Sequence, residues 1–193
     1  MILQITLKYQ TLDICEALSY LFCKDGISKI NMKIDGKAVS SFENTTIPLS
    51  CITPNLGINN FETSTFDLYQ TSSVLVYNEK EIAGKTYYIP TTTRIQNTNQ
   101  TIDQKVSLLL DHFENNTKVE TTKKSQLNDG LLSIYLSSRI LDNSENISPT
   151  LYSRLEKSFL SLPDVSSVHI YINNELIHRQ KEILNFHKYI KKI

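Results

Sequence analysis

Two stretches of this chain carry the same order of elements: a helical pattern, then an alternating strand, then a turn. Residues 27–36 fall on residues 165–174 at a constant offset of 138. In both stretches alternate residues are apolar, which is typical of a strand with one buried face. A turn-forming pair ends each strand, Asp35-Gly36 in one and Asn173-Asn174 in the other. The shared order and the shared turn indicate a duplicated unit.

A further strand and a helix precede the repeated strand in each copy. Alternation in Ile2–Leu7 predicts the earlier strand of the first copy, and Leu131–Leu136 predicts that of the second. The offset of 138 also places Leu21 of the first helix on Phe159 of the second. Each copy is therefore expected to be a strand, a helix, a strand and a turn.

Capping signals mark the starts of the predicted helices. Asp13 with Glu16 has the spacing of a capping box, and so has Thr101 with Gln104. Ser148 followed by proline is typical of a third helix start. The polar stretch 115–129 predicts a mobile loop between the last two helices.

A pair of strands is expected before the second helix. The apolar residues Val74 and Val76 predict one strand, and Tyr87-Tyr88-Ile89 predicts the other, joined across Gly84-Lys85. Pro90 places the second strand at a sheet edge, or ends it there, because proline cannot donate to a ladder.

Three parts of the chain resemble the GerM (sporulation and germination M) domain of spore-forming bacteria, which also occurs in some bacterial envelope lipoproteins. Residues 84–94, GKTYYIPTTTR, are similar to its glycine, lysine, tyrosine and VPVTR segment, with Ile-Pro-Thr-Thr where Val-Pro-Val-Thr is usual. Residues 162–173 and 25–36 are similar to its closing segment. Ile47-Pro48-Leu49 with Ile58-Asn59 resembles the stretch that often follows the closing hairpin.

The resemblance implies a division of the chain into four parts. Residues 1–37 would be the back half of a first GerM-like domain, and 38–63 a linker lying along a domain surface. Residues 64–178 would be a complete domain, and 179–193 a helical tail. Because the first domain would lack its front half, we expect this chain to be either cut from a longer tandem protein or a divergent relative.

The family also implies a fold class and a role. Its fold is α+β, a small two-layer domain with a mixed sheet, akin to ring-building domains. Relatives are membrane-anchored, non-catalytic proteins of the cell envelope that oligomerise between the mother cell and the forespore. The resemblance thus implies protein partners or self-association, an extracytoplasmic location, and membrane association through a segment outside this chain.

The residues themselves point away from an enzyme. Five glycines form no phosphate-binding loop, and four histidines show no zinc spacing. Asp111-His112 and Ser107 would lie on one helix, and no strained nucleophile turn surrounds any serine. We therefore expect no catalytic residues, no cofactor and no metal. The free thiols Cys15, Cys23 and Cys51 are expected to act as small hydrophobes, with a disulfide to Cys51 as the alternative.

Charge and motif content also bear on the partners. Twenty basic and twenty acidic residues cancel, and no GxxG loop is present, which disfavours nucleic acid and an RNA-binding KH domain. The basic, weakly amphipathic tail is expected to pack on its own domain, with contact to an anionic membrane as the alternative.

Ten tyrosines and no tryptophan make tyrosine the natural interface residue, because its ring packs while its hydroxyl stays wet. Tyr171 is expected on the exposed face of the closing strand. With Tyr88 and Arg94, which lie in the GerM-like segment, it forms the candidate interface. The sequence thus predicts a self-assembling or partner-binding protein. The alternative is a sensory module that binds a ligand or glycan between the segment from Tyr87 to Arg94 and the helices.

Overall fold

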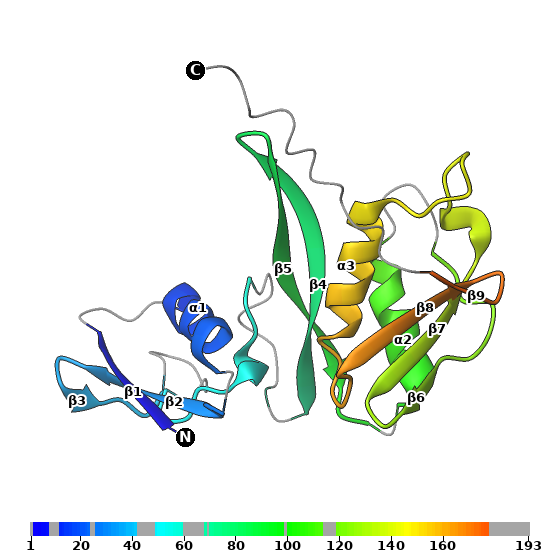
Figure 1. Cartoon of the computed structure of the whole chain (residues 1–193). Helices are drawn as coiled ribbons and strands as arrows, with labels where there is room; N and C mark the ends of the chain where they lie inside the picture. Colours follow the sequence, from blue (N-terminus) through cyan, green and yellow to red (C-terminus); the bar gives the residue numbers. More distant parts are fainter. Residues whose placement is uncertain are drawn as a thin grey trace, which may run out of the picture.

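The computed structural model describes residues 2–7, 12–23, 26–41, 49–59, 68, 70–98, 100–113 and 119–177. Helices and strands are mixed, and the strands form separate small sheets (Figure 1), so the predicted α+β class is confirmed. The predicted helical tail lies outside the described residues. The predicted domain boundaries stay a prediction.

The first unit is a parallel strand pair joined by a helix. Strands β1 (Ile2–Leu7) and β2 (Lys29–Ile34) pair in parallel, and helix α1 (Leu12–Phe22) connects them. Strand β3 (Lys37–Ala38) then pairs antiparallel with β2. A parallel pair requires such a crossover connection, which explains why helix and strand recur together in the sequence.

The second unit repeats this arrangement. Strands β7 (Leu131–Leu136) and β8 (Ser167–Ile172) pair in parallel, and helix α3 (Pro149–Phe159) connects them. Antiparallel strands flank the pair, β6 (Gln126–Asn128) beside β7 and β9 (Glu175–Ile177) beside β8. The result is a four-stranded sheet in the order β6-β7-β8-β9.

The register of the two units shows that the sequence repeat is structural. Ile2 lies opposite Lys29 in the first unit, and Leu131 lies opposite Ser167 in the second. Lys29 and Ser167 are separated by the predicted offset of 138. Both turns after the closing strand have two successive residues with positive φ: 48° and 76° at 35–36, and 53° and 66° at 173–174. This is the backbone of a two-residue type I′ hairpin turn.

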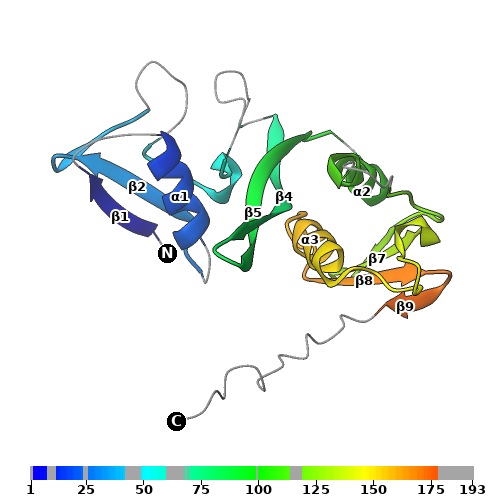
Figure 2. The same ribbon diagram turned by 90° about the horizontal axis from the view of Figure 1, so that it is seen from above.

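A long hairpin stands between the two units (Figures 1 and 2). Strands β4 (Thr71–Ile82) and β5 (Lys85–Gln96) pair only with each other. The turn is at Ala83-Gly84, one residue before the predicted position, and both residues have positive φ. Both strands are edges, so the predicted edge position of Pro90 is confirmed.

Helix α2 (Ile102–Leu110) follows the hairpin and completes the second unit. The Thr101 side chain accepts from the Gln104 amide while the Gln104 side chain accepts from the Thr101 amide, so the predicted capping box is confirmed. Short 3-10 helices occur at Pro54–Leu56, Asp111–Phe113 and Ser138–Ile140. In Figure 2, α2 and α3 lie on the same face of the β6–β9 sheet.

Two hydrophobic clusters hold these parts together. The larger one gathers residues of β4, β5, α2, α3 and the four-stranded sheet around Phe159. The smaller one joins α1 and β2 to the connecting segment, with Cys15, Ile30 and Met32 packed against Leu49, Ile52 and Leu56. Ile30 and Ile52 also exchange backbone hydrogen bonds of 2.8 and 2.9 Å. Leu49, Ile52 and Leu56 of the connecting segment are thus part of the first unit's core.

Three local predictions are wrong. Asp13 lies inside α1, which begins at Leu12, and Glu16 is 3% exposed, so these residues are not a capping box. The stretch 115–129 is more than a loop, because Val119 is buried and β6 begins at Gln126. The two helices also match at an offset of 137, because the connection from α3 to β8 is one residue longer than that from α1 to β2.

Candidate interaction surfaces

The outer face of the four-stranded sheet carries a pair of stacked tyrosines. Tyr135 and Tyr171 are direct neighbours on β7 and β8, and their ring centroids are 5.0 Å apart at an interplanar angle of 19°. The ring of His169 meets Tyr171 edge-on at 6.2 Å. The Lys123 ammonium group lies 5.3 Å from the Tyr135 ring centroid. Tyr171 and His169 thus point away from the buried face, as predicted.

This outer face is poor in charge. The buried residues of β7 and β8, such as Ile134 and Ile170, point to the helices, so their neighbours point outward. The residues that alternation and pairing place on the outer face include no acid. They are Gln126, Asn128, Leu131, Ser133, Tyr135, Ser167, His169, Tyr171 and Leu176.

Tyr88 lies on the hairpin beside a lysine of α3. The Lys157 ammonium group is 5.7 Å from the Tyr88 ring centroid and 5.8 Å from that of Tyr77. Tyr77 in turn shares a hydrogen bond of 3.2 Å with the Tyr20 hydroxyl of α1. Burial raises the pKa of Tyr77, and the hydrogen bond to Tyr20 adds to the shift. This row of residues links α3, the hairpin and α1.

Arg94 is held in an internal network. Its guanidinium group donates to the Asn55 backbone carbonyl at 3.1 Å and to the Thr71 hydroxyl at 2.7 Å. The Asn55 side chain donates to the carbonyls of Leu68 and Thr71 at 2.7 and 3.0 Å, and accepts from the Ser73 amide at 2.7 Å. Asn55 and Arg94 therefore form a clasp that fixes the connecting segment to the hairpin.

The three candidate interface residues do not form one patch. Tyr171 lies on the outer face of the four-stranded sheet, whereas Tyr88 and Arg94 lie on β5. Tyr88 adjoins α3, and Arg94 adjoins the connecting segment. Their role in an interface stays a prediction.

Helix α1 exposes an apolar stripe that its counterpart buries. Ile14, Leu21 and Phe22 are 39%, 50% and 42% exposed, whereas Phe159 at the matching end of α3 is 0% exposed. In the second unit α2 and the hairpin pack against α3. Among the described residues, the first unit has no equivalent of that cover.

A cavity of about 200 Å³ lies where α1 meets the hairpin. Its walls come from α1, the connecting segment, β4 and the end of α3, and not from the predicted segment between Tyr87 and Arg94. The lining residues are Ser19, Tyr20, Cys23, Pro54, Gly57, Ser73, Leu75 and Ser161.

All three cysteines are free thiols in the structure. Burial raises the pKa of the Cys15 thiol from 9.0 to about 11, and the nearby charge of Glu16 adds to the shift. Burial also raises the pKa of Cys23, whose thiol faces the Ile52 carbonyl at 3.8 Å. Cys51 is exposed. A raised pKa lowers the thiolate fraction, so Cys15 is suited to a packing role.

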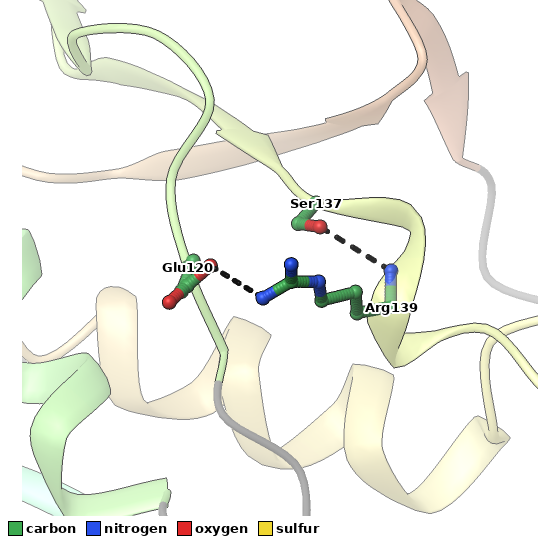
Figure 3. A network of polar contacts seen from close by, with 3 residues as sticks. All are labelled: Glu120, Ser137 and Arg139. Atoms are coloured by element: carbon green, nitrogen blue, oxygen red, sulfur yellow. Dashed lines mark hydrogen bonds and ion pairs between the residues drawn. The ribbon is translucent and has the colours of Figure 1, made fainter.

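Other polar groups of the described residues serve local structure. Arg139 pairs with Glu120 at 3.2 Å, and its amide donates to the Ser137 hydroxyl (Figure 3). Both charged side chains are exposed, at 71% and 38%, so the pair contributes little to stability. Within the described ranges no three metal-binding side chains come together, and no helix is long and apolar enough to span a membrane.

No family model matches the chain. The spore germination protein GerM of Bacillus subtilis (strain 168) is 26% identical to it over 176 residues, which are 82% of this chain and 48% of that protein. The structure of the tandem GerMN domains of the sporulation protein GerM from Bacillus subtilis matches 90% of this chain and 67% of that chain, with a TM-score of 0.71 and 20% identity.

The chain has the tandem GerMN fold. The resemblance to the GerM domain family that three short motifs predicted is therefore confirmed. The chain spans about half the length of the curated GerM relative. In this tandem GerMN fold, the GerM-like segment 84–94 forms most of β5, and the closing segments form β2 and β8 with their turns.

Sequence reasoning missed the residues that fasten the hairpin. Ser158 and Ser161 accept from the amides of Tyr77 and Leu75 at 2.9 and 2.7 Å, and Arg154 donates to the Tyr77 carbonyl at 2.9 Å. The available signal was the position of Ser158 next to Phe159 in the apolar stripe, where a polar residue needs a buried partner. Asn55 gave no signal, because its partners are distant in the chain.

Proposed function

We propose that this protein acts in spore formation or germination as a non-catalytic protein of the cell envelope that assembles with copies of itself or with protein partners. Its sequence relative is called a spore germination protein, and the solved tandem domains belong to a sporulation protein. An extracytoplasmic location, with membrane anchoring by a segment outside this chain, is part of the same proposal.

The outer face of the four-stranded sheet carries this proposal. Sheet faces that meet water usually carry charged residues, whereas cores of protein interfaces are depleted in charge and enriched in tyrosine. Here a stacked pair, Tyr135 and Tyr171, occupies the two central strands, and the outward residues of β6 to β9 include no acid. The Lys123 ammonium group beside the Tyr135 ring is the charge recorded at this centre, so a second copy can meet the face without burying a carboxylate there.

Replacing Tyr171 tests this assignment. Tyr171→Ala removes a ring that packs at the centre of the face, and interface tyrosines commonly cost about 1–2 kcal/mol or more when truncated. We expect self-association, measured by sedimentation equilibrium at high protein concentration, to weaken by about tenfold. Tyr171→Phe keeps the ring and should associate as the parent does.

Two results would contradict this proposal. If Tyr171→Ala associates as the parent does, the sheet face is not the contact between copies. A chain that stays monomeric at the highest concentrations and binds no envelope protein would remove the assembly function.

The cavity beside α1 favours a second candidate function, the binding of a small ligand or glycan. The hydroxyls of Ser19 and Ser73 donate to main-chain carbonyls and keep lone pairs that can accept from a ligand. Leu75 and Pro54 offer apolar contact. Its volume of about 200 Å³ is below the range of about 300–1,000 Å³ for typical ligand sites. A group as small as an acetamido substituent or a single sugar edge is the size that fits.

A thermal-shift screen separates the two functions. Cell-wall fragments that occupy the cavity must raise the melting temperature, because binding to the folded state stabilises it. Leu75→Trp would fill the cavity and abolish such a shift. The absence of any shift with millimolar fragments would eliminate this candidate and leave assembly untouched.

A further inference from the structure

In the half of the hairpin away from its turn, hydrogen bonds from outside the hairpin cover both edges. On β4 the amides of Ser73, Leu75 and Tyr77 donate to the side chains of Asn55, Ser161 and Ser158. On β5 the Thr92 amide donates to the Ile58 carbonyl at 3.0 Å, and the Asn59 side chain donates to the Pro90 carbonyl at 2.7 Å. Side chains and the connecting segment thus take the place of neighbouring strands.

The cover ends at the same level on both edges. Tyr77 and Pro90 are the last covered residues, and they are directly paired across the hairpin. Because outward and inward amides alternate along an antiparallel strand, the next outward positions are 79 and 81 on β4 and 86 and 88 on β5. Within the described residues, the main chain at these positions meets no partner beyond the hairpin.

The two open edges differ in how well they are protected. The outward positions of β4 are Glu79 and Glu81, and both are exposed. Natural edge strands use such charges to prevent pairing with other chains. The outward positions of β5 are Thr86 and Tyr88, with Tyr87 between them and Ile89 after them. This run of β-forming residues is uncharged between Lys85 and Pro90, so no charge stands at its outward positions.

We propose that the open edge of β5 is an interface at which a second copy of this chain adds its own β5, antiparallel and related by a two-fold axis. The proposal rests on the assembly function above and names one contact for it. The occupant is a second copy because the edge is complementary to itself in both hydrogen bonding and charge, whereas β4 is not.

The geometry of the two-fold pairing follows from the register of the hairpin. Thr86 of one copy lies opposite Tyr88 of the second copy, and each such pair exchanges both main-chain hydrogen bonds. Tyr87 lies on the axis and meets Tyr87 of the second copy as a close pair. Aromatic and β-branched pairs of this kind stabilise a sheet. The corresponding pairing of β4 would set Glu79 opposite Glu81, and like charges so placed repel.

Tyr87 is 45% exposed, so its ring is available for this contact. The shared edge is short, and its buried area falls below the roughly 1,200 Å² of stable interfaces. We therefore expect a weak contact that becomes effective where a second interface or a membrane concentrates the protein.

A proline substitution provides the first test. Thr86→Pro removes only an outward amide, and the hairpin already contains Pro90 at an outward position of the same strand. Sedimentation velocity across a concentration series should show self-association of the full chain weakened at least tenfold. Thr86→Val keeps the amide, and Glu81→Pro alters the other edge, so both should associate as the parent does.

Charge reversal on the axis provides a test that does not depend on proline. Tyr87→Lys sets two ammonium groups opposite each other across the axis, and Tyr87→Glu sets two carboxylates there. Each variant alone should remain monomeric, whereas an equimolar mixture should form a heterodimer. Amide exchange followed by NMR should slow at Thr86 and Tyr88 as concentration rises, and stay constant at Glu79 and Glu81.

Several outcomes would overturn the proposal. Association that survives Thr86→Pro in a folded protein, or a mixture of charge variants that stays monomeric, excludes the β5 edge. Equal loss in Glu81→Pro excludes the two-fold arrangement in favour of β4 pairing with β5. If Thr86→Pro associates as the parent does while Tyr171→Ala weakens association, the assembly function stands and the β5 contact is excluded.

Discussion

The two αβ units have the same register and the same turn geometry, yet they differ in what covers the helix. In the second unit α2 and the hairpin close over α3, and Phe159 is fully buried. In the first unit the matching face of α1 stays partly open, with Phe22 42% exposed. A strand-helix-strand unit therefore determines the pairing of its strands by itself. Burial of the outer face of its helix requires a further layer, such as α2 and the hairpin in the second unit.

The first unit obtains part of its stability in another way. The connecting segment inserts Leu49, Ile52 and Leu56 into the small cluster below α1. The clasp of Asn55 and Arg94 then ties that segment to the hairpin between the two units. The connecting segment thus links the first unit to the hairpin, whereas the larger core around Phe159 contains no residue of the first unit.

The largest expected contrast is between the two helix ends. Phe159→Ala removes a fully buried ring and should lower the free energy of unfolding by about 3–5 kcal/mol. Phe22→Ala, at the matching position of α1, should cost less than about 1 kcal/mol because much of the ring already meets water. Urea unfolding followed by circular dichroism measures both. Equal losses would show that the stripe of α1 is covered in solution.

A smaller contrast is expected at the clasp. Asn55→Ala removes the side-chain hydrogen bonds to the Ser73 amide and to the carbonyls of Leu68 and Thr71, at a cost of about 1–3 kcal/mol. Amide exchange should accelerate in β2 and stay unchanged in β7. Asn59→Ala, which loses one exposed hydrogen bond, is the matched control. Acceleration in both strands would mean that the two units unfold together.

The smallest effect concerns the thiols, which all lie in the first unit or its connecting segment. Iodoacetamide should label Cys51 first and Cys15 only after unfolding. Between pH 9.0 and about 11 the Cys15 thiol ionises in the unfolded chain while it stays protonated in the folded one. Stability should therefore fall as pH rises through this window. In Cys15→Ala that part of the pH dependence should vanish.

Local patterns predicted the fold well where both partners were near in the sequence. Alternation located β2, β7 and β8, and the Thr101 capping box located the start of α2. The failures arose where distant contacts override a local pattern. Glu16 has the spacing of a capping residue but is buried in α1. Val119 lies in a polar stretch but packs in the larger core.

The candidate interface was only partly predictable. Alternation alone placed Tyr171 on an outer face, because a strand has two sides and the apolar side was known. The same reasoning did not show that Arg94 is held by Asn55, since that contact joins residues far apart in the chain. It also did not show that the cover of the hairpin ends at Pro90, which requires knowing what lies beside each edge.

The way α3 fastens β4 has a consequence for sequence drift. A strand held by a neighbouring strand uses main-chain groups on both sides, which almost any residue supplies. Leu75 and Tyr77 instead depend on the hydroxyl groups of Ser161 and Ser158. A single nucleotide change can erase such a bond, and few residues other than serine and threonine can restore it. Homologues that have lost these serines are expected to have gained another polar group there or to have released the hairpin.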